Sequence, residues 1–461
     1  MRTFGCQMND HDSERLAGAL EADGLVASPD LESADVVVFN TCCIRENADN
    51  KFYGHLGNLK ALHQRRPDMQ IAVGGCLAQM DGQRIRDRAP HVDVVFGTHN
   101  LGRAPELLRR AAASGPVVEI LDEPRPSDGS AAGDHQAAAL GAVRDLPYAA
   151  WVTIQTGCDN SCAFCIVPSV RGGETSRPVD GLLAEVRALA GRGVTEVTLL
   201  GQNVNSYGRD LTRRRPLFAQ LLREVGAVDG IRRVRFTSPH PKDLRPETIA
   251  AMAETAEVCN HLHLPLQSGS DAVLVAMRRG YTAERYLARL ADARAAIPDL
   301  AVTTDLIVGF PGETDSDFVR TLEVAAEAGY DSAYTFVFSP RPGTRAAAME
   351  DRFVPEEVMA ERMERLRTVV ERSALARHRA RLGRVEEVVV EGPSKREPSV
   401  MTGRTRQNKL VHFEPTDNRS IPAGSYADVA VTAAARHHLT GALRIVTARP
   451  AHRVLIPVSA G

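Results

Sequence analysis

Short apolar runs alternate with helical patterns over the first 113 residues of the chain. The expected strands are residues 2–4, 35–41, 70–75 and 92–97, and the expected helices begin near Asp12, Arg45, Ala78 and Asn100. Strands that alternate with helices are typical of βαβ units, whose strands run parallel in one sheet. The pattern therefore predicts an α/β domain built on a doubly wound parallel sheet.

The same alternation restarts at Ala149 and repeats six times. The expected strands are residues 149–155, 195–201, 231–238, 260–266, 301–310 and 332–338. Helical patterns follow them at residues 179–192, 217–228, 245–255, 283–297, 316–327 and 355–381. Six such units predict a partial (β/α)6 barrel, which is open on one side and so admits a large substrate.

The composition changes between these two regions and again after them. Residues 115–147 are rich in Pro, Gly, Ala and Asp without a clear period, which is typical of a surface linker. After Gly383, short strands separated by turn residues, at 386–392, 409–414 and 427–434, predict a small all-β module of barrel type. The expected division is 1–114 for the first domain, 115–147 for the linker, 148–382 for the barrel, 383–448 for the β module and 449–461 for a tail.

The overall composition is that of an ordinary globular protein, with 461 residues, 43% hydrophobic and 25% charged. No apolar stretch approaches the roughly 18 residues of a membrane span, and the start has neither an apolar leader segment nor a cleavage site. We therefore expect a cytoplasmic protein that does not cross a membrane. The net charge of -2 gives no whole-protein attraction for nucleic acid, so any RNA affinity must come from local basic faces.

The strongest chemical signal is a C-x3-C-x2-C spacing formed by Cys158, Cys162 and Cys165, directly after the first strand of the barrel region. A [4Fe-4S] cluster normally takes four cysteines, so three leave one iron open. The amino and carboxylate groups of S-adenosylmethionine fit that position, where an electron can cleave the sulfonium and release a 5′-deoxyadenosyl radical. A zinc site or buried structural thiols are the alternatives, although zinc would need a fourth protein ligand.

A second set of cysteines is scattered along the first domain. Cys6, Cys42 and Cys76 each follow a predicted parallel strand. Because the carboxyl ends of parallel strands meet at one edge of a sheet, three sulfurs there can hold a second cluster with one free iron. Buried cysteines that act only as small apolar residues are an equally good interpretation of the spacing.

Two further cysteines are interpreted as structural. Cys43 is adjacent to a proposed ligand and should point elsewhere, although it is also a possible alternate ligand. Cys259 lies at a junction between a predicted helix and a predicted strand.

These residues resemble the radical S-adenosylmethionine methylthiotransferases, and within that family the enzymes that modify isopentenyladenosine in tRNA. The matching blocks span nearly the whole chain in the family's order: GCQMNDHDSERLAG at 5–18, ADVVVFNTCCIRENA at 34–48, GGCLAQ at 74–79, GCDNSCAFCIVPSVRG at 157–172, LLGQNVNSYG at 199–208, FTSPHP at 236–241, LPLQSGSD at 264–271, DLIVGFPGET at 305–314 and FSPRPGT at 338–344.

The resemblance implies a radical reaction that places a methylthio group on carbon 2 of N6-isopentenyladenosine at position 37 of tRNA. It implies two [4Fe-4S] clusters, a radical cluster and an auxiliary cluster. The implied ligands are Cys158, Cys162 and Cys165 for the radical cluster and Cys6, Cys42 and Cys76 for the auxiliary one. One S-adenosylmethionine methylates a sulfur on the auxiliary cluster, and a second supplies the radical.

The resemblance also suggests where S-adenosylmethionine binds. Gln202 and Asn203, at the end of the second barrel strand, match the segment that holds the methionine part in relatives, and residues 305–313 match the adenine-ribose region. The alternative is that Gly201, Gly309 and Gly312 serve only backbone geometry in tight turns. His240 and His263, also at strand ends, are equally consistent with structural roles and with substrate contacts.

The final β module resembles the small RNA-binding TRAM domain of these enzymes. Residues 361–384 before it carry eight Arg against three Glu, an excess of +5 that suits tRNA phosphates, although a solvated helix face is the usual explanation of such a run. The module itself adds basic residues as further candidate contacts: Lys395, Arg396, Arg404, Arg406 and Lys409.

Two relatives with other substrates are the nearest alternatives, the enzymes acting on an aspartate of a ribosomal protein and on threonylcarbamoyladenosine in tRNA. Their first motifs are closer to GCPKN and GCKVN than to the GCQMN found here, which favours the isopentenyl substrate. An iron-sulfur carrier or RNA-binding module without catalysis is a hypothesis of another class. Met1 is only five residues from Cys6, so we expect a shortened first strand. We expect a monomer, served by an electron donor and a sulfur or cluster donor whose identities the sequence does not give.

Overall fold

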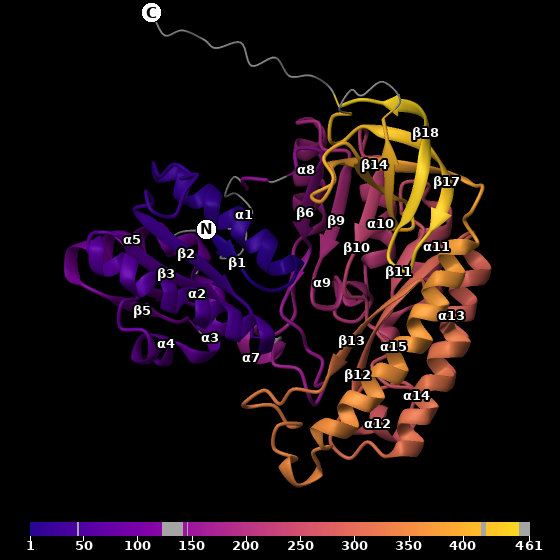
Figure 1. Ribbon diagram of the computed structural model, residues 1–461, viewed down its shortest axis with the longest axis horizontal. Helices are drawn as coiled ribbons and strands as arrows, with labels where there is room; N and C mark the ends of the chain where they lie inside the picture. The colour runs from indigo at the N-terminus through magenta and orange to yellow at the C-terminus, as the bar shows by residue number, and fades with distance from the viewer. Residues whose placement is uncertain (44–45, 122–141, 145, 416–420, 451–461) are drawn as a thin grey trace, which may run out of the picture.

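The computed structural model describes residues 1–461 except 44–45, 122–141, 145, 416–420 and 451–461. Three folded parts follow one another along the chain, two α/β domains and a β barrel (Figure 1). Most of the expected linker and most of the expected tail lie outside the described residues.

The first domain has five parallel strands in the order β1-β2-β3-β4-β5. Their bounds are β1 Arg2–Thr3, β2 Val36–Thr41, β3 Gln70–Gly75, β4 Val94–Phe96 and β5 Val117–Glu119. The helices are α1 Gln7–Ala22, α2 Glu46–Arg65, α3 Cys76–Asp81, α4 Gln83–Arg88 and α5 Ala104–Ser114, with a 3-10 turn η1 at Thr98–Arg103.

Alternate residues of the central strands enter two separate apolar cores, one on each face of this sheet. Val37 and Phe39 face α2, α3 and α4, whereas Val38 faces α1 and α5. The predicted parallel sheet with helices on both faces is therefore confirmed. The described strands follow sequence order, however, without the reversal of order found in many doubly wound sheets.

Two predicted boundaries in this domain were wrong. Strand β5 pairs with β4, so the sheet extends into residues 115–147, which were assigned to the linker. Helix α1 begins at Gln7 rather than near Asp12, and Cys6 is its N-cap with extended backbone. The first turn of α1 is polar, which hid its start from a search for an apolar period.

The second domain contains all six predicted strands, in two parallel sheets of order β10-β9-β6 and β11-β12-β13. Their bounds are β6 Ala149–Thr153, β9 Glu196–Leu200, β10 Arg233–Phe236, β11 His261–His263, β12 Ala301–Val308 and β13 Ser332–Val337. A parallel bridge between Val234 and Val258, with a 2.9 Å hydrogen bond from Cys259 N to Val234 O, joins the two sheets.

All six predicted helices of this domain are present, together with shorter pieces near the strand ends. The helices are α7 Val167–Arg171, α8 Val179–Ala190, α9 Arg209–Thr212, α10 Phe218–Gly226, α11 Pro246–Glu254, α12 Asp271–Ala276, α13 Ala283–Ala296, α14 Asp315–Ala328 and α15 Glu356–Arg379. The shorter pieces are β7 Gln155–Thr156, β8 Thr175–Ser176, and the 3-10 turns η2 Val204–Ser206, η3 Pro241–Asp243 and η4 Glu350–Arg352.

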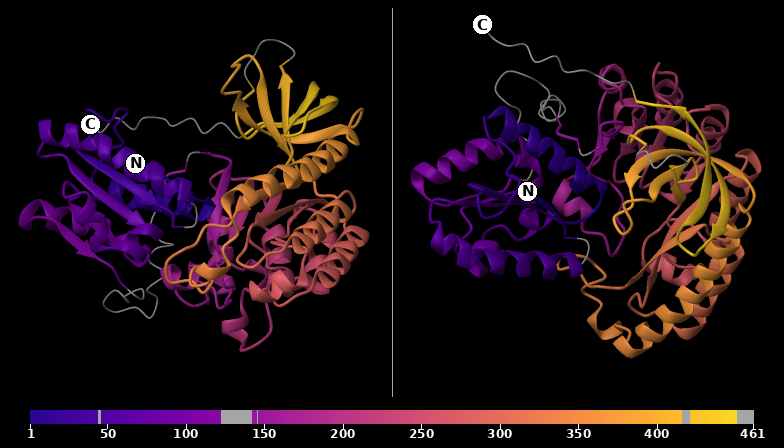
Figure 2. Two further views of the ribbon diagram at one scale, coloured as in Figure 1. Left: turned by 60° about the horizontal axis from the view of Figure 1, so that its bottom comes forward. Right: turned by 45° about the horizontal axis from the view of Figure 1, so that its top comes forward.

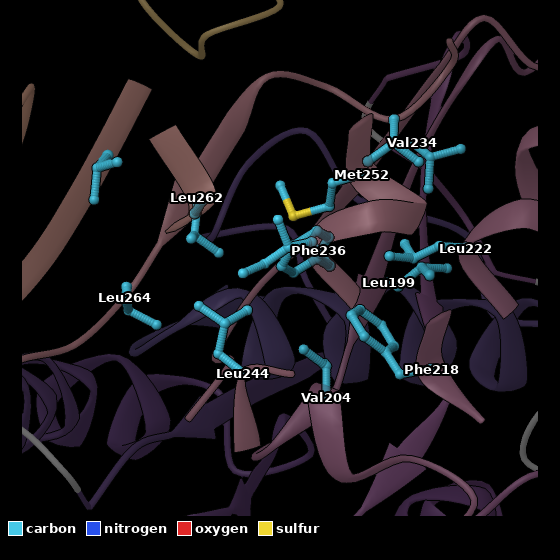
Figure 3. Close-up of a cluster of buried hydrophobic side chains, with 14 of the residues drawn as sticks. Leu199, Val204, Phe218, Leu222, Val234, Phe236, Leu244, Met252, Leu262 and Leu264 are labelled. Atoms are coloured by element: carbon cyan, nitrogen blue, oxygen red, sulfur yellow. The ribbon is translucent and has the colours of Figure 1, made fainter. Parts of the chain in front are cut away.

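Local sequence explains how some of these helices begin and what holds them to the sheet. Thr314 and Asp317 form a capping box at the start of α14, where each side chain accepts a hydrogen bond from the other's backbone N–H. Figure 3 shows part of the apolar core between helices and sheet in this domain. There Phe218 of α10 meets Phe236 of β10 edge to face, with ring centroids 5.1 Å apart. Burial of such side chains stabilises the stack of helix on sheet by about 1.5 to 3 kcal/mol each.

The C-terminal part is a closed barrel in the order β14-β15-β16-β18-β17. Its strands are β14 Val385–Pro393, β15 Met401–Thr405, β16 Leu410–Glu414, β17 Tyr426–Ala434 and β18 Leu439–Ala448. The barrel type is confirmed, but β15 and β18 were missed. Both contain glycine, at Gly403 and Gly441, which weakens a strand pattern and here allows the neighbouring strand to approach closely.

The first domain and the barrel both lie against the second domain (Figure 2). Helix α15 runs from the second domain to the first strand of the barrel (Figure 1). Among the residues that the structure describes, no helix combines the length and the apolar character needed to cross a lipid bilayer.

Candidate metal and cofactor sites

The three cysteines with C-x3-C-x2-C spacing lie on one loop between β7 and α7. Gly157 begins the loop with φ +70°, and a Cβ there would be 1.9 Å from the carbonyl oxygen of Gly173, so only glycine fits. Cys158 N donates to Gly172 O at 3.1 Å, and Cys165 N donates to Cys162 O at 3.1 Å. Backbone hydrogen bonds therefore fix the conformation of this loop.

One of these thiols is buried and two are partly exposed, and a buried cation contacts one of them. Burial raises the pKa of Cys158 and raises that of Cys165 to about 12. Arg279, 6% exposed, donates from Nη1 to Cys162 Sγ at 3.2 Å and from Nε to the Tyr281 hydroxyl at 3.1 Å. The guanidinium therefore holds the Cys162 sulfur by a hydrogen bond from a charged donor.

The number and spacing of these donors bear on which metal group the loop suits. Within the described part of the chain, no group of three or more His, Cys, Asp or Glu side chains is close enough to hold one metal ion. In a [4Fe-4S] cluster each thiolate binds its own iron, so three separated thiols on one loop fit that group.

The second set of cysteines meets at the edge of the first sheet, at the carboxyl ends of β1, β2 and β3. Cys6 caps α1, Cys42 follows β2 directly, and Cys76 is the first residue of α3. A Cβ added at Gly5 would be 2.7 Å from the Cβ of Cys42, so the first two positions are in close proximity. Cys6 Sγ donates to Asn9 Oδ1 at 3.5 Å, and Asn9 Nδ2 donates to Thr41 O at 2.9 Å.

Cys43 does not point away from this set, contrary to the expectation from its position. Its side chain is fully buried in the apolar core beside Cys76, Leu77 and Phe52. A hydrogen bond between the two thiols is the largest cause that lowers the pKa of Cys76 to about 6 and raises that of Cys43. The polypeptide turns directly after β2, which brings Cys43 against α3.

The segment proposed to hold the methionine part of S-adenosylmethionine has unused acceptors. Asn203, 1% exposed, donates from Nδ2 to Asp243 Oδ2 at 2.9 Å. Its Oδ1 and the Oε1 of Gln202 are buried and have no hydrogen-bond partner among the residues the structure describes. Both oxygens suit a donor such as an ammonium group.

The glycines of the fifth barrel strand support the backbone interpretation. Gly309 and Gly312 have φ of +77° and +82°, and a Cβ at these positions would meet Met359 Sδ at 2.3 Å and Arg352 Nη2 at 2.4 Å. Glu313 accepts from Gly309 N at 2.9 Å and pairs with Arg362 of α15 at 2.9 Å. This segment is shaped by its contacts with the helix and turn behind it.

The two histidines at strand ends have different surroundings. His240 is buried, accepts from Lys242 N on Nδ1 at 3.2 Å, and packs edge to face on Tyr281. Burial lowers its pKa to about 2, so it is neutral. His263 is half-buried, with Nε2 3.5 Å from Asp305 Oδ2 and Nδ1 3.0 Å from Thr303 Oγ1.

Most arginines of residues 361–384 have partners inside the protein. Arg362 pairs with Glu313 and Asp315, and Arg381 pairs with Glu386 and Asp299. Other partners are Glu361 for Arg365, Gly329 O for Arg377 and Asp299 for Arg384. The exposed arginines without a described partner are Arg367, Arg372 and Arg379, so the excess of +5 is largely neutralised locally.

Three of the barrel's five candidate tRNA contacts are also engaged internally. Lys409, 5% exposed, pairs with Asp331 at 2.6 Å, and Arg406 donates to the carbonyl oxygen of Val258 at 2.8 Å. Arg404 pairs with Glu391 at 2.6 Å within the barrel. Lys395 and Arg396 remain exposed.

Residues that sequence patterns missed hold the barrel to the second domain. Arg233 of β10 is fully buried and donates to Arg404 O at 2.7 Å and to Glu387 Oε1 at 2.9 Å. Arg235, two residues on, donates to Thr405 O at 2.9 Å. The sequence signal that could have identified these residues is the alternation of arginines inside a short buried strand.

Cys259 is buried next to β10, where its backbone N–H donates to Val234 O.

A hollow of about 540 Å³ lies between α8 and α10, lined by Asp180, Arg187 and Glu224 among others. None of the cysteines lines it. The chemistry of the thiols, rather than this hollow, identifies the site.

Family models match two parts of the chain. Residues 152–325 match the Radical SAM superfamily, and residues 1–97 match the uncharacterized protein family UPF0004. The first match covers the domain with the cysteine loop, and the second covers the scattered cysteines.

Curated relatives match nearly the whole chain. A protein of Acidothermus cellulolyticus named tRNA-2-methylthio-N(6)-dimethylallyladenosine synthase is 55% identical over 445 residues, covering 95% of this chain and 86% of the relative. A protein of Mycolicibacterium smegmatis with the same name is 52% identical over 461 residues, covering 97% and 87%. Among solved structures, the radical S-adenosylmethionine methyltransferase TsrM from Kitasatospora setae has a TM-score of 0.52 at 14% identity, covering 73% of this chain and 72% of that one, which shows likeness of fold.

Proposed function

This chain belongs to the family of tRNA-2-methylthio-N(6)-dimethylallyladenosine synthases, and from that membership we propose that it methylthiolates carbon 2 of N6-isopentenyladenosine at position 37 of tRNA by a radical mechanism. The observation that carries the proposal is identity of 50% or more to relatives of this name across almost the entire chain. The relatives reported above are named for this one reaction, so the aspartate and threonylcarbamoyladenosine substrates are not favoured.

The proposed ligands are Cys158, Cys162 and Cys165 for a radical [4Fe-4S] cluster and Cys6, Cys42 and Cys76 for an auxiliary one. When bound, the first would supply the electron that cleaves S-adenosylmethionine and the second the sulfur that is transferred. The support is chemical. Each set offers three thiols, one fewer than the four that usually bind a [4Fe-4S] cluster, so one iron of each cluster would be left open.

The surrounding residues support this assignment by what they do to the thiols and the cofactor. Arg279 holds the Cys162 sulfur by a hydrogen bond from a charged donor. Gln202 and Asn203 offer two buried acceptors for the amino group of S-adenosylmethionine. Both acceptors lie at the carboxyl end of β9, the end of parallel strands where α/β folds place ligands.

The finer architecture is also proposed on this basis. We assign residues 148–382 to a partial (β/α)6 radical domain, because six parallel strands alternate with helices in sequence order. We assign residues 383–448 to a TRAM module that contributes to tRNA binding, because the closed five-stranded barrel exposes Lys395 and Arg396. The first domain extends to Glu119, since β5 belongs to its sheet.

The test is anaerobic iron and sulfide analysis of the reconstituted protein, with mass spectrometry of isopentenylated tRNA after incubation with S-adenosylmethionine and dithionite. The variants are a Cys158/Cys162/Cys165 triple alanine and a Cys6/Cys42/Cys76 triple alanine. Cys259→Ala, which changes a buried cysteine outside both sets, is the matched control.

We expect about eight irons in the wild type, about four in either triple variant, and a methylthio product from wild type and control alone. Four irons in the wild type without product would leave a single-cluster radical enzyme and end the methylthiotransferase assignment. Unmodified S-adenosylmethionine in every sample would instead favour a carrier without catalysis.

A further inference from the structure

A buried ion pair connects the two domains that carry the cysteines. Arg171 Nη2 lies 2.7 Å from Asp12 Oδ2, and the two side chains are 9% and 4% exposed. Arg171 ends helix α7, which follows Cys165 closely, and Asp12 lies on α1, which Cys6 caps. Each partner is therefore tied by a few residues to one of the two cysteine sets.

The guanidinium of Arg171 lies on the side of the first domain. Ile166 and Val170, around α7, are part of the apolar core that contains Cys76, and the Val170 carbonyl accepts from Thr98 Oγ1 at 2.6 Å. Burial lowers the pKa of Arg171, but the charges of Asp12, Cys76 and Cys6 offset this and raise it well above its usual value. After the contact with Cys43, the charge of Arg171 contributes to the lowered pKa of Cys76. The second domain thus supplies a fixed positive charge to the cysteines of the first.

A cation and an anion near the same thiols have opposite electrostatic effects on a cluster bound there. Iron bound by thiolates becomes more negative on reduction, so a nearby positive charge favours the reduced form and a nearby negative charge disfavours it. Low local dielectric makes both effects large, because neither side chain is screened by water.

We propose that Arg171 and Asp12 are positioning residues for the metal site at Cys6, Cys42 and Cys76, Arg171 raising and Asp12 lowering the reduction potential of the cluster held there. This proposal rests on the auxiliary cluster of the proposed function. Arg171 acts across the domain boundary, so docking of the second domain is part of what sets the potential.

The experiment uses the full-length chain with Cys158, Cys162 and Cys165 changed to alanine, so that only the first domain can hold iron. Arg171→Gln and Asp12→Asn are made in this background, and iron, sulfide and the midpoint potential are measured by a titration followed by electron paramagnetic resonance. We expect Arg171→Gln to shift the potential down and Asp12→Asn to shift it up. Both variants break the same ion pair. If their only effect were a loss of local structure, the midpoint potential would therefore shift in the same direction in both.

Two further variants keep the result interpretable. Arg171→Lys keeps the charge, so its potential should stay near that of the parent. This variant can be measured even if Arg171→Gln fails to fold. Arg362→Gln removes an arginine from a comparably buried pair with Glu313 of the second domain, at 2.9 Å, and should shift nothing.

Shifts in the same direction, or none, in a chain that retains iron would overturn the proposal and leave the auxiliary cluster intact. A background chain without iron would overturn the auxiliary cluster and this proposal together. An unchanged potential in Arg171→Lys beside opposite shifts in the other two variants would support it.

Discussion

A single side chain supplies the cation that contacts the thiols of the cysteine loop. Arg279 is the cation that contacts Cys162, and its exposed neighbour Arg278 has the same charge without that contact. A hydrogen bond to a charged group contributes about 1.5 to 3 kcal/mol, which corresponds to about tenfold to a hundredfold in affinity.

Arg279→Gln is therefore expected to release iron from the radical site about tenfold faster or more when the holoenzyme is exposed to a chelator. The measurement is the rate of iron transfer, followed by absorbance, in a chain whose first-domain cysteines are alanine. Arg278→Gln is the matched control and should match the parent. Equal rates for the two variants would show that the contact with Cys162 has no energetic role.

His240 gives a second prediction at this scale, on pH. Burial holds its pKa at about 2, against an ordinary value of 6.5, so only the unfolded chain binds the proton as pH falls below 6.5. Folding stability due to neutral His240 is present above pH 6.5 and is lost toward lower pH, by about 2 kcal/mol at pH 5.

His240→Asn keeps an acceptor for Lys242 N and removes the titration. We expect the variant to lose about 2 kcal/mol less stability than the parent between pH 7 and pH 5, measured as the midpoint of the first urea transition under anaerobic conditions. An identical loss in both proteins would mean that other buried groups cause the loss of stability at low pH.

Residue-level chemistry was only partly predictable from the sequence. The meeting of Cys6, Cys42 and Cys76 follows from strand ends, because parallel strands bring their carboxyl ends to one edge. The contact of Cys43 with Cys76, and the cations Arg171 and Arg279, depend on tertiary approach across 33 to 159 positions, which no local pattern encodes.

Strands and helices are predicted better than residue contacts, because each has its own period. All six strands of the second domain were found, whereas β15 and β18 were missed where glycine interrupts the alternation. The arginine-rich segment 361–384 was expected to suit tRNA phosphates, but some of its side chains instead pair with residues next to α14 and in the barrel. A count of charges does not reveal which are paired.

Strand β10 provides a prediction at the scale of elements. Arg233 is buried between β10 and the barrel, so Arg233→Ala removes a donor from Glu387 Oε1 and from the carbonyl oxygen of Arg404. We expect the barrel to detach more often, with faster tryptic cleavage at residues 380–384 and weaker tRNA binding, while S-adenosylmethionine cleavage without tRNA persists.

The control is Arg232→Ala, since Arg232 is 38% exposed and pairs with the same Glu387 at 3.1 Å. Surface pairs of this kind contribute about 0 to 1 kcal/mol, so this variant should be cleaved at nearly the parental rate. Similar proteolysis of both variants would show that Arg233 does not fasten the barrel.

At the scale of the whole molecule, the first and second domains are also joined by Arg341 and Asp49. The Nη1 to Oδ2 distance is 2.8 Å, and the side chains are 9% and 17% exposed. Arg341 belongs to the block RPGT at 341–344, so part of that motif is explained by contact between domains. Sequence patterns give each domain separately and do not predict this arrangement.

Arg341→Ala is expected to loosen the contact and to reduce methylthio product about tenfold to a hundredfold, because reacting groups on two domains lose alignment. Cleavage of S-adenosylmethionine should persist, and small-angle X-ray scattering should give a larger radius of gyration. Arg345→Ala, which changes an exposed arginine four positions on, is the control. Proportional loss of both activities would argue against a role in alignment.

The insertion of Ile166 and Val170 into the core of the first domain has a consequence for biosynthesis. The ribosome makes Val95, the last strand residue of that core, 75 positions before Val170. At 5–20 residues per second, the core remains incomplete for about 4 to 15 s after its own strands have been made. The face of the sheet beside Cys76 is therefore uncovered in the nascent chain during that interval, until the second domain closes over it.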